Sequence, residues 1–565
     1  MNENRNLLIA FGLSIAIMFG FYQLYEKPKH EKLLQAKALE QALNAVQPVP
    51  QPAQSKSVVT PSVPTQQDLV NQSPRITILT DTIKGSIRQV GAVIDDVLLV
   101  KYTETTDKNS PMIRLLQDQS TTQGYSVING WKAANNCDAG SMPCETTSWQ
   151  IQGEHTKLTP NTPVTLVWFN DRGMKFERVI SIDNQYMMTI TDHVTNHSDK
   201  EVGLQPYSQI CRKNPPKSQG FFILHEGPIG YFNTKLFEGS YEDQAKSPVT
   251  QQSTGGWIGF TDKFWLVSLI PDQKSVVQID YGYAKEAYTA QFTAAPIIVR
   301  PGEVSTYTYH VFTGAKVLRM LDDYEPKVGV AHFDLAVDFG WFYFLTKPLF
   351  YMLEFLHEFL GNLGLAILAL TILFKILLYP MATKSYRSMA RLKNLQPKIQ
   401  QVQNVYKNDR ARQSQELMAL YKKEKVNPAG GCLPMLIQAP IFFCLYKVLF
   451  VSIEMRHAPF FGWIHDLSAP DPTSFINLFG LLPFDPPSFL QIGIWPLLMG
   501  ASMVIQQRMN PQPADPAQAK IMMIMPIMFT YLFASFPAGL VVYWTWNNIL
   551  SMAQQWFITK RMTQK

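Results

Sequence analysis

The sequence predicts a membrane protein with two unlike parts: a polytopic α-helical membrane bundle of six transmembrane helices, five of which form its core, and an all-β sandwich domain. Three observations lead to this fold class. Residues 356–557 are mostly long apolar segments, whereas residues 75–327 alternate short β-branched and aromatic runs with turn residues. In addition, Lys375 interrupts the apolar run from Leu363 to Tyr379. That run is about as long as a bilayer core requires, so a cation within it costs roughly 2.5–3.5 kcal/mol unless water or a partner meets it.

The N-terminal part is predicted to be an anchor and a tether. Residues 1–25 contain an apolar stretch from Leu7 to Tyr25 without a small-x-small cleavage site, which favours an uncleaved transmembrane anchor over a removed signal peptide. Residues 26–74 become rich in Gln, Pro, Ser and Val and hold few aromatic residues. Such a composition does not bury a core, so we expect a flexible linker.

Residues 75–330 are predicted to form the sandwich. Apolar runs such as 164–169 and 306–311 are separated by turn signals, and many short strands at this spacing suggest a large antiparallel sandwich. The histidines of this part show no paired acid and base, so surface or core positions are favoured over catalysis. Cys137 and Cys144 are close enough in sequence for a disulfide, and two free thiols fit equally well.

Residues 331–357 are aromatic and apolar but are interrupted by charges and Pro348, which predicts an interfacial amphipathic helix; a plain continuation into the next helix is the alternative.

Residues 358–557 are predicted to form the five-helix core. Its predicted spans are 359–379, 432–453, 492–507, 521–536 and 540–557, and the last two are joined by a tight hairpin.

Loop charge predicts the orientation. Residues 381–427 carry eleven Lys and Arg against three Asp and Glu, so this loop and the basic tail 558–565 are expected in the cytoplasm. The loop 454–490 is mainly acidic and is expected outside, with the β domain, which leaves both termini cytoplasmic. The basic loop predicts two helices, 382–406 with Pro397 near the middle and 409–425, capped by Asn408-Asp409. Such helices suit anionic lipids, ribosomal RNA or acidic segments; a merely topogenic loop is the alternative.

Several polar residues within the spans are candidate functional residues. Lys375 lies roughly 6–8 Å below the cytoplasmic interface, where it either snorkels to the headgroups or faces a wet groove, with Thr371 one turn earlier on the same face. The last span carries a stripe at i, i+4, i+7 and i+11 spacing, and Gln438 is a polar residue of the third span. Interhelical hydrogen bonding and groove lining both explain these residues. The stripe consists of Trp544, Asn548, Ser551 and Gln555.

Enzyme chemistry is not indicated. No Cys/His spacing resembles a metal site and no phosphate-binding loop ends in Lys-Ser/Thr, so no cofactor, nucleotide or small-molecule substrate is predicted. A small-solute transporter is disfavoured because no paired repeat with broken helices is apparent. A membrane-anchored carbohydrate enzyme is disfavoured because no acid/base pair is apparent.

Four motifs resemble the YidC family of membrane protein insertases. They are 395–400 (LQPKIQ), 422–434 (KKEKVNPAGGCLP) with 436–442 (LIQAPIF), 463–467 (WIHDL) and 536–543 (FPAGLVVY). The resemblance covers residues 356–557, and the anchor with a large β domain is similar in architecture to the Gram-negative type, whose periplasmic domain is a β-supersandwich.

The resemblance implies a hydrophilic groove around a positive charge in the second span, commonly Arg and here Lys375, with Thr371, Gln438, Tyr543 and Trp544 at groove positions. Lysine keeps the charge but lacks the planar fork of donors. The resemblance also implies that the protein lies in the inner membrane with its β domain in the periplasm. It inserts nascent membrane proteins, alone or with the Sec translocon, and assists their folding. The ribosome would bind the basic loop and tail, and anionic phospholipids are further partners.

Overall fold

The computed structural model describes residues 73–134, 142–216, 224–340, 342–407, 409–424, 433–480, 491–510 and 516–563, together with residues 66, 426 and 482. The predicted N-terminal span, most of the linker and Cys137 lie outside these ranges. The described residues fall into two compact units, of which residues 397–426 form one and all the others form the second.

The β domain of the second unit contains a sheet of eleven strands. Along the chain, strands of this sheet are separated by strands of the second sheet. The apolar runs of the sequence therefore appear as separate short strands. In spatial order the strands are β14 (Val249–Thr254), β17 (Val276–Ala284), β18 (Ala287–Ala294), β11 (Val202–Lys213), β5 (Tyr125–Ala133), β3 (Val93–Thr103), β2 (Ile83–Arg88), β1 (Arg75–Leu79) and β7 (Lys157–Leu158), with β19 (Ile297–Val299) on β11 and β4 (Met112–Leu116) on β3.

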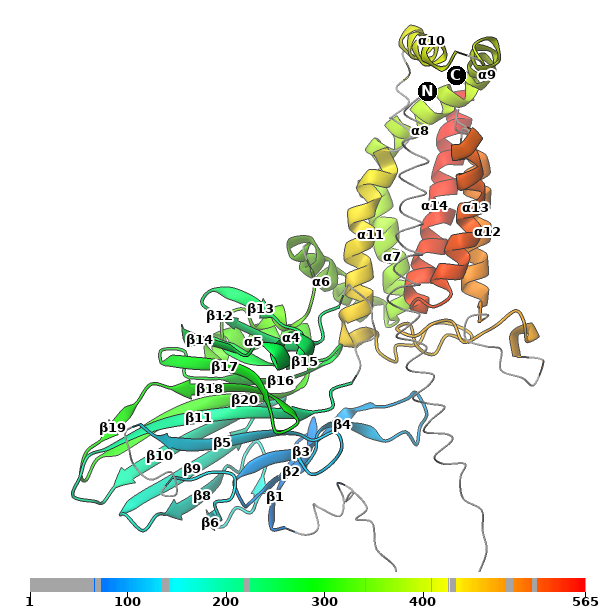
Figure 1. Ribbon diagram of the computed structural model, residues 1–565. Coiled ribbons are helices and arrows are strands. Elements are labelled where there is room, and N and C mark those ends of the chain that lie inside the picture. Colours follow the sequence, from blue (N-terminus) through cyan, green and yellow to red (C-terminus); the bar gives the residue numbers. More distant parts are fainter. Residues whose placement is uncertain are drawn as a thin grey trace, which may run out of the picture. The chain divides into compact units, whose positions relative to one another are not determined.

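A second sheet of nine strands packs against the first (Figure 1). Burial alternates along β9 and β10, as expected for strands with one face in a core. The strand order is β13 (Lys235–Glu238), β12 (Gly227–Phe232), β15 (Trp257–Thr261), β16 (Trp265–Ile270), β20 (Val304–Ala315), β10 (Met187–Asn196), β9 (Met174–Ile182), β8 (Val164–Phe169) and β6 (Gln150–Gln152). The short helix α4 (Tyr241–Lys246) precedes β14. The predicted all-β domain is therefore confirmed.

One buried ion pair joins the two sheets. Arg178 on β9 is fully buried and donates to both carboxylate oxygens of Asp192 on β10, at 2.7 and 2.8 Å. The same guanidinium donates to the Asn129 carbonyl of β5, and the Trp131 indole donates to Asp192. Because every charge here has several partners, the pair fixes how the sheets face each other.

Three helical segments follow the sheets: α5 (Leu318–Val328), η3 (Phe333–Ala336) and α6 (Tyr343–Leu360). The left-handed residue Gly361, with φ of 68°, ends α6, and Asn362 caps the next helix by accepting from the Leu365 amide. The alternative of one continuous helix across this point is therefore wrong.

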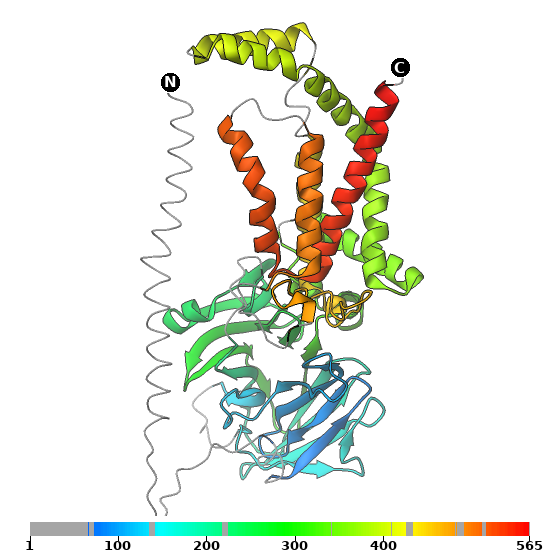
Figure 2. The same ribbon diagram turned by 90° about the vertical axis from the view of Figure 1, so that its right-hand side faces the viewer.

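The remaining helices of this unit form a bundle: α7 (Leu363–Leu377), α8 (Tyr379–Asn394), α11 (Leu433–Val451), α12 (Ile494–Met509), α13 (Pro516–Phe533) and α14 (Ala538–Thr563). They overlap the five predicted apolar segments. Figure 2 shows α12, α13 and α14 as three neighbouring rods. Among the described residues, no single helix meets length and hydropathy criteria for a membrane span; α7 and α8 meet them only as a pair, which is bent by 69°.

The loop before α12 satisfies the free amides at two helix N-termini. Asp471 accepts from the Trp495 amide at the start of α12. The Ala538 and Gly539 amides at the start of α14 donate to loop carbonyls, at 2.7 and 3.0 Å. These contacts fix the α13–α14 hairpin, whose connection is residues 534–537. Two short 3₁₀ segments, η5 (Ile453–Met455) and η6 (Leu478–Gly480), lie in this loop.

The smaller unit contains the helix α10 (Arg410–Lys423) and most of α9 (Gln396–Val405). The prediction of one helix over 382–406 is wrong: it is divided between α8 and α9, because Pro397 is tolerated only in the first turn of a helix. The predicted cap of the next helix is confirmed, since Asp409 accepts from the Arg412 amide. Lys398 and Glu424 form an ion pair at 2.7 Å within this unit.

Candidate functional site

Two adjoining cavities lie within the helical bundle. The smaller has a volume of about 50 Å³ and the larger about 380 Å³. The smaller is lined by Thr371, Phe374, Lys375, Leu378, Met381, Ala382, Tyr386, Gln438, Ile441, Tyr543, Asn547 and Gln554. The larger is lined by residues of α8, α11, α12, α13 and α14, which include Trp544, Asn548 and Ser551. Seven of the eight candidate residues from the sequence therefore line one cavity or the other, and Gln555 lines neither.

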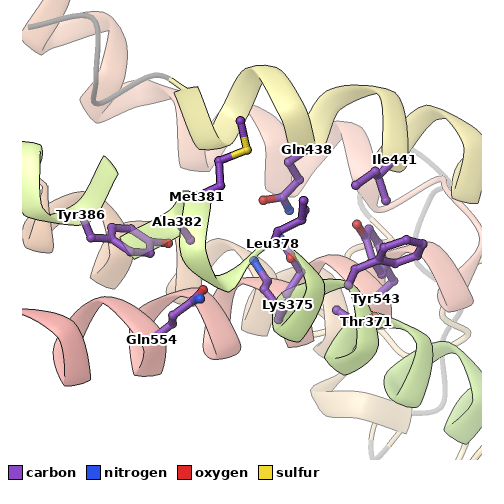
Figure 3. A pocket seen from close by; sticks show the side chains of 12 residues that line it. Thr371, Lys375, Leu378, Met381, Ala382, Tyr386, Gln438, Ile441, Tyr543 and Gln554 are labelled. Carbon is purple, nitrogen blue, oxygen red and sulfur yellow. The ribbon is translucent and has the colours of Figure 1, made fainter. Parts of the chain in front are cut away.

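The two cavities share a wall. Tyr386, Gln438, Tyr543 and Asn547 line both of them. Figure 3 shows Gln438 on α11 and Tyr543 on α14 facing the same space as Lys375.

Lys375 lies in the last turn of α7, and its side chain points toward the bundle interior (Figure 3). Its ammonium donates a hydrogen bond of 2.7 Å to the Ser551 hydroxyl on α14. The bend between α7 and α8, where Pro380 occupies the first turn of α8, keeps α8 beside this lysine. Lys375 therefore lines the smaller cavity with its ammonium bonded across to α14.

The described residues that line the two cavities carry a positive charge and no negative one. Among the described residues that line the cavities, Lys375 is the one charged side chain, and no Asp or Glu is present. Thr371 is buried one turn before it and donates to the Ile367 carbonyl of its own helix at 2.7 Å. The threonine hydroxyl is therefore already satisfied, which leaves Lys375 with the strongest unused donor capacity on this wall.

The four residues of the α14 stripe contact different neighbouring segments of the chain. Asn548 donates to the Ser502 hydroxyl of α12 at 2.9 Å, and Gln555 donates to Asn510 at 3.2 Å. Asn548 therefore both bonds to a neighbouring helix and lines the larger cavity, whereas Gln555 makes its hydrogen bond outside the two cavities. Ser551 instead receives Lys375, while Trp544 packs its ring 4.7 Å from Phe442 on α11.

Several lining residues are not evident from the sequence pattern. Asn547 and Gln554 are spaced i−4 and i+3 from Ser551, so a wider stripe would have included them. Tyr386 was missed because the basic segment around it was assigned to a cytoplasmic loop. It is buried against Met389 and Ile558, which attaches α8 to α14.

Methionines line one side of the larger cavity. Met522 and Met525 of α13 face it together with Met389 and Met503. The neighbouring Met523 and Met528 are exposed on the outer side of α13. Because unbranched thioethers adapt to many shapes, this wall tolerates apolar groups of different sizes.

Comparisons with known proteins show which protein family the chain resembles. A model described as the 60Kd inner membrane protein family matches residues 355–565, and a model of the YidC periplasmic domain matches residues 75–352. The chain is 46% identical to a membrane protein insertase YidC of Rickettsia canadensis (strain McKiel) and 46% identical to that of Rickettsia bellii (strain OSU 85-389), each over 99% of this chain and 100% of the relative. A crystal structure described as an active YidC insertase with its first transmembrane domain resolved is 17% identical, covers 85% of this chain and 91% of that chain, and has a TM-score of 0.34.

Proposed function

The chain belongs to the YidC family of membrane protein insertases, and we propose that it moves its substrates through the two adjoining cavities around Lys375. Its activity is membrane insertion of proteins, which is transport without a chemical reaction. Residues 75–352 contain the periplasmic domain of the family, so the protein is one of the inner membrane.

The observation that carries this proposal is the position of the Lys375 ammonium. It is held inside the bundle, beside polar side chains and away from any cavity-lining carboxylate of the described chain. An acidic or polar N-terminal segment of a nascent chain would enter from the cytoplasm and be attracted to this charge. Opposite charges about 4 Å apart attract by about 4 kcal/mol at an effective dielectric constant of about 20.

The apolar segment of the substrate would leave along α11 and α13. The outer face of α13 is apolar and exposed, with Ile524, Ile527 and Tyr531 among its residues. Transfer of about 20 apolar residues into lipid supplies the free energy, at about 25 cal/mol for each Å² removed from water. The cavities lower the barrier because they shorten the dry distance that the polar segment crosses.

The proposed orientation follows from charge. The basic segment 381–427 and the tail 558–565 lie in the cytoplasm, where they bind the ribosome and anionic lipids, and both termini are cytoplasmic. The protein spans the membrane six times and works alone or with the Sec translocon on nascent membrane proteins, whose folding it assists.

Helix α6 is proposed to lie along the outer membrane interface. Its charged side chains contact α5 and η3; Arg319 of α5 pairs with Glu354 at 2.7 Å. On other sides it exposes Phe344, Phe355 and Phe359, which are 73%, 65% and 81% accessible. A helix with ionic contacts on one side and exposed aromatic rings on the other suits the boundary between water and lipid.

The test of the central charge uses Lys375→Glu and Lys375→Arg in reconstituted vesicles, with protease protection of a short single-span substrate as the readout. We expect the Glu variant to insert about tenfold less or worse, because losing about 1.4 kcal/mol of attraction already has that effect. The Arg variant keeps the charge and should remain close to wild type. Wild-type insertion by the Glu variant would contradict the proposed role.

A further inference from the structure

Two helices, α7 and α14, meet at the hydroxyl of Ser551. Its oxygen accepts from the Lys375 ammonium of α7 at 2.7 Å. Its own hydrogen is donated to the Asn547 carbonyl, one turn earlier on α14, at 2.7 Å.

These contacts use the hydrogen of the serine hydroxyl and one of its acceptor positions. A hydroxyl has one hydrogen to donate and two lone pairs that accept. The Asn547 carbonyl takes the hydrogen, so Lys375 occupies an acceptor position. Since Ser551 is buried, the bond to the Asn547 carbonyl fixes the direction of the hydroxyl, and its lone pairs fix the direction of the ammonium.

The direction in which Ser551 holds the ammonium matters for the two cavities. Lys375 lines the smaller cavity, whereas Ser551 lines the larger one. The hydrogen bond between them therefore draws the ammonium to the boundary between the cavities. One of its three hydrogens is used in this bond, which leaves two for a substrate carboxylate.

We propose that Ser551 is the positioning residue for Lys375: it holds the ammonium at the boundary of the two cavities and so makes insertion selective for acidic segments. This inference rests on the proposed function of the Lys375 cavities. Without the hydroxyl, the flexible lysine stem turns toward the cytoplasmic end of α7, where headgroups and water solvate the charge. The cavity then keeps its shape but loses the charge that attracts a carboxylate.

The experiment compares two single-span substrates that differ only in their N-terminal tail, with Asp residues in one and Asn residues at the same positions in the other. Full-length variants are reconstituted in vesicles, and protease protection gives the ratio of Asp-tail to Asn-tail insertion. This ratio is the readout, because a general loss of folding lowers both substrates together and leaves it unchanged.

We expect Ser551→Ala to lower the ratio about fivefold, a factor that corresponds to about 1 kcal/mol. Ser551→Cys keeps the shape but accepts only weakly, so it should lower the ratio as well and serves if the Ala variant folds poorly. Ser551→Thr should retain the ratio, because Thr545 on the same helix already bonds to the carbonyl four residues earlier.

Thr545→Ala is the matched control, since it removes a buried hydroxyl of α14 that lines neither cavity. Its ratio should equal that of the wild type.

In a Lys375→Met background, Ser551→Ala should not change the ratio further. A wild-type ratio in both Ser551→Ala and Ser551→Cys, or an equal fall in Thr545→Ala, would overturn the positioning role. If the wild type itself shows no Asp preference, the proposed function fails too; if Lys375→Met abolishes a preference that Ser551→Ala keeps, only the positioning role fails.

Discussion

Two buried cations of the β domain illustrate how differently a charge is accommodated at the residue scale. Arg178 is surrounded by acceptors, with a bidentate carboxylate and a backbone carbonyl. Lys316 is equally buried, but its ammonium donates to a neutral acceptor, the Thr261 hydroxyl at 2.8 Å. The carboxylates of Asp262 and Asp338 act on it only through space, so burial lowers the pKa of Lys316 to about 8.

The lysine is therefore expected to destabilise the folded β domain at neutral pH. The pKa of Lys316 is lower in the folded protein than in the unfolded chain, so the unfolded chain binds the proton more tightly. The free energy of unfolding should therefore increase as the pH rises from about 8 to 10.5. Below pH 8 the full cost remains, at most about 3 kcal/mol. We expect Lys316→Met to raise the free energy of unfolding at pH 7 by about 1–3 kcal/mol.

The measurement is denaturant unfolding of the full-length protein, followed by the β signal in circular dichroism, at pH 7 and pH 10. The gain from Lys316→Met should shrink at the higher pH. The exposed Lys101 provides the control, since Lys101→Met should change stability little at either pH. A loss of stability in Lys316→Met at pH 7 would show that the lysine is better solvated than its contacts indicate.

The site residues show what a sequence reveals at this scale. Lys375 was found because a charge within an apolar run has few explanations. Its inward direction and its acceptor were not predictable, since snorkelling satisfies the same pattern. Tyr386 gave no signal, because an aromatic residue within a basic segment is ordinary and only the bend between α7 and α8 brings it to the site.

At the scale of elements, α6 is held by ionic contacts on one side. Lys347 pairs with Asp322 of α5 at 2.7 Å and also with Asp334 of η3. The Tyr351 hydroxyl donates to Asp322 as well. Sequence patterning indicated a charged, aromatic helix here but not its partners, because those partners come from separate turns of the chain that only the fold brings together.

We expect Lys347→Met to loosen α6, because it leaves two carboxylates facing each other without their shared cation. Hydrogen exchange of the α6 amides, measured by mass spectrometry on the reconstituted protein, should become several-fold faster, which corresponds to about 1–2 kcal/mol. The control is Lys327→Met, which removes a solvent-exposed pair with Asp323 at 3.7 Å and should leave exchange unchanged. Equal exchange in both variants would mean that apolar packing alone holds α6.

At the scale of the whole chain, the β domain contacts the bundle but contributes nothing to the cavity walls that the structure describes. Arg456, just after α11, donates to the carbonyls of Thr103 and Glu104. Lys447 of α11 pairs with Asp338 at 2.9 Å. The division into a β part and a helical part follows from composition. These contacts do not, since isolated residues such as Arg456 and Lys447 carry no periodic signal.

This separation predicts that insertion survives removal of the sheets. Deleting residues 75–315 removes the contacts of Arg456 but keeps α5, η3 and α6 with their ion pairs, and it keeps the Lys447–Asp338 pair. We expect the shortened protein to insert a single-span substrate within a few-fold of the full-length rate.

Deleting residues 75–340 also removes Asp322, Asp334 and Asp338, which leaves Lys347 and Lys447 without these carboxylates. We expect this longer deletion to lose most of the insertion activity. Protease protection in vesicles, normalised to the amount of reconstituted protein, distinguishes the two. If the shorter deletion is as inactive as the longer one, the sheets themselves are required, and the cavities alone do not account for insertion.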